Sequence, residues 1–152
     1  MVHLLDMTAT AHALIGGAIA ASISNPSIGL PLAALSHPIA DMIPHWDFGW
    51  GWKKKTKLTL FVQASFDLIF GIIVTFLIFG KQVDIIYLMT AIFLSEVWDI
   101  LQMPYLLWGW KFPFSTFYKF QHEINGKARL PWGILTQAAT VGGLVFALRF
   151  IR

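Results

Sequence analysis

Residues 58–79 read LTLFVQASFDLIFGIIVTFLIF. At 1.5 Å per residue, a helix of this stretch is about 33 Å long, which matches the ~30 Å hydrocarbon core of a bilayer. Its single ionisable residue, Asp67, lies near the middle. The stretch predicts a transmembrane helix. A carboxylate at that depth is costly and needs a partner or a bound cation.

The composition of the whole chain is typical of a membrane protein. Hydrophobic residues make up 57% and charged residues 12% of its 152 residues, and the mean hydropathy is +0.66. These values fall outside the usual balance of a soluble domain. We therefore expect an all-α fold, a polytopic membrane helix bundle of about five helices that forms one domain over residues 1–152. The expected segments are 8–24, 28–43, 58–79, 83–108 and 131–150, and the first, rich in Ala and Gly, is expected to be central.

The basic residues predict the orientation. If every segment crosses the membrane, eight of the eleven Lys and Arg residues share one side: Lys53, Lys54, Lys55, Lys57, Lys111, Lys119, Lys127 and Arg129. By the positive-inside rule this side is cytoplasmic. We expect a multi-pass protein of the inner (plasma) membrane, with its N-terminus inside and its C-terminus outside. The short first two segments can alternatively form a re-entrant pair. No cleaved signal peptide is expected, because the start carries Asp6 and no basic run.

The apolar segments contain an unusual set of ionisable residues. The rise of a helix places all of them in the cytoplasmic half. They are His12, His37, Asp41, His45, Asp67, Glu96 and Asp99. His37, Asp41 and His45 follow at four-residue steps, so they are expected to share one helix face. The sequence predicts one site that opens to the cytoplasm.

Charge balance indicates a metal at this site. Polar contacts between helices suffice to explain Gln63 and Gln102. They do not explain four carboxylates and three histidines, because too few internal Lys or Arg residues can neutralise them. A divalent cation or shared protons are the remaining ways to balance this buried charge. With no cysteine in the chain, imidazole and carboxylate suit zinc first, or Mn, Fe or Ni, as one or two ions.

Each residue of the set has an expected role. The predicted metal ligands are His12, His37, Asp41, His45, Asp67 and Asp99. Glu96, the deepest carboxylate, is the candidate general base. His122, in an aromatic and basic loop, is a candidate second catalytic residue, and His3 is expected at the surface. The lysines at 53–57, together with Trp46, Trp50 and Trp52, indicate either an interfacial belt for anionic headgroups or a topology signal alone.

The segment Ser36-His-Pro-Ile-Ala-Asp-Met-Ile-Pro-His-Trp-Asp, with His12 upstream, carries a family resemblance. It resembles the bacterial and archaeal membrane-bound metal-dependent hydrolases and, more distantly, the zinc-dependent phospholipase C and single-strand nuclease superfamily. The match consists of His37, Asp41 and His45, although Pro44 directly precedes His45 here. The resemblance implies that His12, His37, Asp41 and Asp67 are metal ligands.

These observations predict a membrane metal-dependent hydrolase that acts on a phosphoester or lipid-type substrate from the inner leaflet. Membrane lipids are the expected partners, and a homo-oligomer remains an option. A metal-ion or proton-coupled transporter is the alternative, because it also places carboxylates and histidines at depth. Nucleic-acid binding is not expected, since the net charge is only +3 and the membrane explains the basic cluster.

Overall fold

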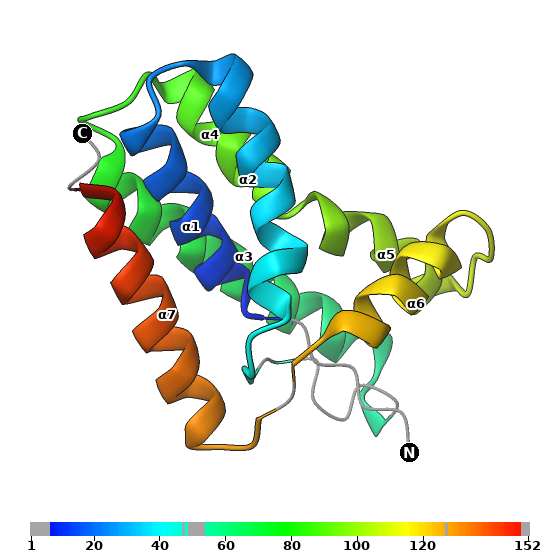
Figure 1. Ribbon diagram of the computed structural model, residues 1–152. Coiled ribbons are helices and arrows are strands. Elements are labelled where there is room, and N and C mark those ends of the chain that lie inside the picture. Colours follow the sequence, from blue (N-terminus) through cyan, green and yellow to red (C-terminus); the bar gives the residue numbers. More distant parts are fainter. Residues whose placement is uncertain (1–6, 47, 49–53, 127, 150–152) are drawn as a thin grey trace.

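The computed structural model describes residues 7–46, 48, 54–126 and 128–149. Within these ranges the fold is all-α, as expected, with seven helices and no β-strand (Figure 1). The helices are α1 (Ala9–Ser22), α2 (Pro26–Asp41), α3 (Lys57–Phe79), α4 (Ile85–Ser95), α5 (Val97–Trp108), α6 (Phe114–Ile124) and α7 (Trp132–Arg149).

Helix α1 is the central element of the bundle. It packs against α2, α3, α4 and α7, whereas α5 and α6 pair with each other and extend to one side (Figure 1). Small residues allow this close packing. A Cβ atom on Gly16 would lie only 2.7 Å from the Oγ atom of Ser95 in α4. The expectation that the Ala- and Gly-rich segment is central is confirmed.

Helix α3 presents an apolar surface to the outside. Its four buried residues, Asp67, Gly71, Thr75 and Phe79, follow at four-residue steps and form one stripe toward the bundle. The other faces carry exposed apolar side chains, among them Phe66 (67% exposed) and Leu77 (77% exposed). A surface helix of a soluble protein has the opposite pattern, with polar side chains outward. The outer surface of α3 is therefore suited to hydrocarbon.

The lengths of the helices bear on how many times the chain crosses a membrane. Among the described residues, α3 alone is long and apolar enough to span a bilayer as a single helix. Helices α4 and α5 meet the same test only together, as a pair bent by 48°. Helices α1 and α7 are apolar but shorter. One or two candidate spans agree with a membrane location, while a polytopic bundle and its orientation stay predictions.

The helices differ from the expected five segments in three main respects. The stretch 83–108 forms two helices that break at Glu96, and the loop after it contains α6. Helix α2 ends at Asp41, three residues before Pro44. Proline has no N–H to donate and disfavours helical geometry in the residue before it. His45 therefore lies outside the helix, and its expected position on one helix face with His37 and Asp41 is wrong.

Candidate metal centre

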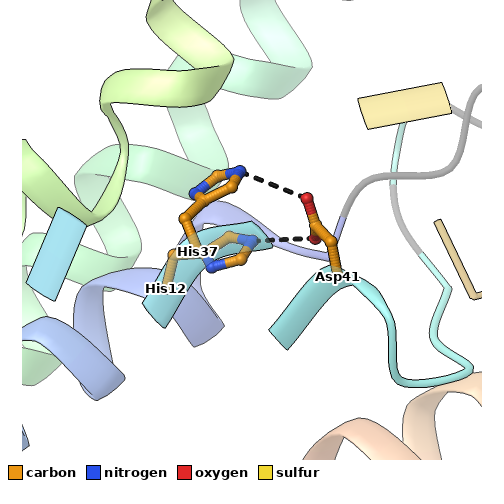
Figure 2. Close-up of side chains that lie close together, drawn as sticks. All are labelled: His12, His37 and Asp41. Carbon is orange, nitrogen blue, oxygen red and sulfur yellow. Dashed lines mark hydrogen bonds and ion pairs between the residues drawn. The ribbon is translucent and has the colours of Figure 1, made fainter. Parts of the chain in front are cut away.

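Three buried side chains from α1 and α2 meet inside the bundle: His12, His37 and Asp41 (Figure 2). The Nε2 atom of His12 lies 3.2 Å from Oδ1 of Asp41. The Nε2 atom of His37 lies 3.2 Å from Oδ2 of the same carboxylate. The two imidazole rings stack, with their centroids 3.7 Å apart. Each residue can offer one ligand atom within 4.8 Å of the others, so the group can hold a metal ion.

The surroundings of His37 fix which nitrogen carries its hydrogen. Its Nδ1 atom lies 2.5 Å from the backbone carbonyl oxygen of Ser95, which can only accept. Nδ1 therefore donates, and in the neutral ring Nε2 keeps the lone pair that a metal needs. Ser95 is the last residue of α4, and the last carbonyls of a helix have no partner within it. The end of α4 thus orients His37 in the way typical of a metal ligand.

The carboxylate of Asp41 is held in place from α1. The backbone N–H of Met7, just before that helix, donates to Oδ1 at 2.9 Å. Asp41 is fully buried and ends α2, so its position depends on both helices. His12 differs from His37, because its Nδ1 atom is buried with no hydrogen-bond partner among the described residues.

A second polar group adjoins His37 from the other side. Oδ1 of Asp99, in the first turn of α5, lies 3.3 Å from Nε2 of His37. The side-chain amides of Gln102 and Gln121 donate to the same oxygen of Asp99, at 2.8 and 3.2 Å. Nε2 of Gln121 also lies 3.0 Å from Nε2 of His37. The structure thus brings Asp99 next to the first three residues and adds two glutamines.

Glu96 occupies the break between α4 and α5. It is buried, and its Oε1 atom has no hydrogen-bond partner among the described residues. It directly follows Ser95, whose carbonyl oxygen binds His37. A buried carboxylate oxygen that no donor satisfies is unusual and calls for a physical explanation. This placement agrees with a role beside the metal site.

Asp67 lies apart from this cluster. Its Oδ2 atom accepts from the N–H of Ala9 at 2.7 Å, and its Oδ1 atom accepts from the hydroxyl and the N–H of Thr10 at 2.6 and 3.3 Å. These contacts are those of a carboxylate at a helix N-terminus. Asp67 also lines an open, mostly apolar groove of about 520 Å³ between α1, α3 and α7. Its expected role as a metal ligand stays a prediction.

Two further histidines have their own surroundings. His45 is buried, and its Nδ1 atom donates to the carbonyl oxygen of Ile43 at 2.6 Å. His122 in α6 is half-buried and stacks on Tyr118, with ring centroids 5.8 Å apart. Neither belongs to the group of three.

Several residues of the sequence predictions lie outside the described residues: His3, Asp6, Trp50, Trp52, Lys53 and Lys127.

The residue that sequence reasoning missed is Gln121. It is uncharged and lies in a polar stretch between two apolar segments, so neither charge nor hydropathy distinguished it. One available signal was its position directly before His122. The amphipathic character of 114–124 predicts that one face of this helix is covered, and Tyr118 and Gln121 lie on the covered face.

Two histidines and one carboxylate form a known type of metal-ligand set. Catalytic zinc sites use three protein ligands of this kind and leave the fourth position open for water or substrate. The same set with open positions also suits iron. The donors here therefore fit a divalent transition metal.

Comparison with known proteins adds no relative: no family model, no curated protein and no solved structure matches the chain.

Proposed function

We propose that this protein is a membrane-embedded, metal-dependent hydrolase that acts on a phosphoester or related lipid-type substrate. The buried group of His12, His37 and Asp41 is the observation that carries the proposal, because it offers a catalytic type of ligand set. Asp99 lies 3.3 Å from His37, and Glu96 follows Ser95, whose carbonyl oxygen binds His37, so we propose these two carboxylates for proton transfer. The resemblance in 36–47 supports the same reaction class.

The outer surface supports a membrane location. Exposed apolar side chains cover most of α3, and exposed lysines, Lys54 and Lys57, stand at its start. Cations at a helix end suit the anionic headgroups of the inner leaflet. The apolar groove between α1, α3 and α7 opens on the same surface and can take a hydrocarbon chain. These features support our proposal of a lipid-type substrate.

Different residues of the chain have different roles in the proposed reaction. A divalent metal held by His12, His37 and Asp41 would supply Lewis acidity and would lower the pKa of bound water toward ~7. Ser95 orients His37 through its carbonyl oxygen, and Met7 orients Asp41 through its N–H. Glu96 is the proposed general base, since its buried Oε1 atom is available to take a proton.

The test compares binding and turnover in full-length protein purified in detergent. Elemental analysis of the wild type should find a divalent transition metal, and His37→Ala should lose it. The variant Glu96→Gln keeps the shape of the side chain and removes its basicity. It should retain the metal and lower kcat on a panel of lipid phosphoesters by roughly 10²- to 10⁴-fold. His122→Ala is the matched control for metal content.

One observation favours a transporter as the second candidate. Helices α4 and α5 form a bent pair that breaks at a buried carboxylate, and transporters place their ion sites at broken helices. Liposomes that contain the protein distinguish the two functions. Metal or proton flux that Glu96→Gln abolishes, with no metal-dependent turnover by the wild type, would replace the hydrolase with the transporter.

A further inference from the structure

The side-chain amide of Gln121 lies against Nε2 of His37. The residue is fully buried, and its Nε2 atom lies 3.0 Å from Nε2 of His37 and 3.2 Å from Oδ1 of Asp99. The same Nε2 atom of His37 lies 3.2 Å from Oδ2 of Asp41 and 3.3 Å from Oδ1 of Asp99, so two carboxylate oxygens and the amide surround it. The amide donates to Asp99 and lies against the ring nitrogen of His37. It occupies the position that a metal at His37 needs.

The other end of the same amide is unsatisfied. The Oε1 atom of Gln121 is buried and has no hydrogen-bond partner among the described residues. Buried polar atoms are nearly always hydrogen-bonded, so an exception calls for a physical reason. The amide nitrogen is thus hydrogen-bonded within the cluster, whereas the amide oxygen is not hydrogen-bonded to any described residue.

A half-turn of the amide would exchange its nitrogen and its oxygen. The last torsion of a glutamine side chain is soft and roughly two-fold, so the turn needs little movement of α6. It would place the oxygen against Nε2 of His37, beside the carboxylate oxygens of Asp41 and Asp99 that already face this nitrogen. Three such oxygens close together repel one another unless a cation lies among them. The orientation of the amide therefore depends on whether a cation is bound.

We propose that Gln121 is a metal ligand: when a divalent cation such as Zn²⁺ binds at His37, the amide leaves Nε2, turns over and binds the ion through Oε1. Carbonyl and carboxylate oxygens are ligands that such cations accept beside imidazole. This inference rests on the proposed metal site. It adds α6 to the helices that hold the ion, so that metal binding ties the α5–α6 pair to α1 and α2.

The experiment measures zinc affinity by competition with a chromophoric chelator, on the full chain in detergent. Gln121→Leu removes the amide, whereas Gln121→Glu keeps an oxygen ligand and removes the N–H. Gln102→Leu is the matched control, because Gln102 donates to the same oxygen of Asp99 from α5. We expect Gln121→Leu to weaken zinc binding about tenfold or more. Gln121→Glu should bind as tightly as the wild type or tighter, and Gln102→Leu should change the affinity less than Gln121→Leu.

Infrared difference spectra provide a readout that does not depend on the leucine variant. Addition of zinc to the wild type should shift a side-chain amide carbonyl band, and Gln121→Glu should lack that band. The proposal is overturned if the wild type shows no such band, if Gln121→Leu binds zinc as well as the wild type, or if Gln121→Glu is as weak as Gln121→Leu. Zinc binding that depends on Gln121, without turnover of any substrate, would leave this inference standing and refute the hydrolase. A wild type that binds no zinc would refute both.

Discussion

The carboxylates of Asp41 and Asp67 are held by backbone N–H groups only two residues apart. Met7 donates to Asp41 at 2.9 Å, and Ala9 donates to Asp67 at 2.7 Å. The start of α1 is thus fixed between α2 and α3 by two acidic side chains. Only one of them, Asp41, also faces the imidazoles of the candidate metal centre. The two carboxylates should therefore respond differently to substitution.

Alanine at each of these two positions separates a structural role from a ligand role. Asp67→Ala should lower Tm, because the part-buried N–H groups of Ala9 and Thr10 lose their charged acceptor, at a cost of about 1–3 kcal/mol. It should keep the expected zinc-dependent rise in Tm. Zinc at a concentration 100 times its Kd should add about 2.7 kcal/mol to the free energy of unfolding. Asp41→Ala should lose that rise. Thermal unfolding of each variant with and without zinc is the measurement. Loss of the zinc effect in Asp67→Ala would show that Asp67 is a ligand.

The close contact of α1 with α4 leads to a second prediction. A Cβ atom at Gly16 would lie 2.7 Å from Oγ of Ser95 and 2.9 Å from the carbonyl oxygen of Ala91. Gly16→Ala should therefore push the two helices apart and lower the free energy of unfolding by about 1–3 kcal/mol. It should also weaken zinc binding, because the carbonyl oxygen of Ser95 orients His37.

Gly142 in α7 is the matched control for this substitution. A Cβ atom there would meet nothing within 4 Å. Gly142→Ala should be neutral or stabilise the protein by up to ~1 kcal/mol, through lower chain entropy in the unfolded state. Equal effects of Gly16→Ala and Gly142→Ala on Tm and zinc affinity would contradict the proposed role of this contact.

The sequence identified the core of the site but not its full composition. His12, His37 and Asp41 could be predicted, because charge inside apolar segments is costly whatever the packing. Asp67 was placed correctly on α3, yet it serves the N-terminus of α1. Helical rise gives the depth of a residue, whereas the direction of its side chain depends on which helices pack together. Depth alone therefore could not predict the contacts of Asp67 with Ala9 and Thr10.

The break at Glu96 could not be predicted from local sequence. The residues around it, Leu94-Ser-Glu-Val-Trp98, contain neither proline nor glycine, and a helix can run through such a stretch. Gln121 was missed for a related reason. It is neutral, and only its contacts with His37 in α2 and Asp99 in α5 distinguish it from other glutamines. Both features arise from tertiary packing, which single-sequence patterns do not contain.

A third prediction concerns the membrane crossing of α3. The chain has no native cysteine, so Lys54→Cys and Lys81→Cys place one thiol at each exposed end of this helix. A membrane-impermeant maleimide should label the two positions from opposite sides, with position 54 on the cytoplasmic side. Labelling of both positions from the same side of sealed vesicles would show that α3 does not cross. Detergent-opened vesicles, in which both thiols should react, are the control.

The three central residues of the candidate metal centre all lie on the first two helices, between residues 12 and 41. Ser95 and Gln121, which complete their surroundings, follow much later in the chain. During synthesis the α1–α2 hairpin therefore leaves the ribosome with two imidazoles and a carboxylate before any later helix can cover them. In a chain that folds from its N-terminal part onward, these three residues can bind a metal ion at that stage. The later helices would then close around an ion already in place.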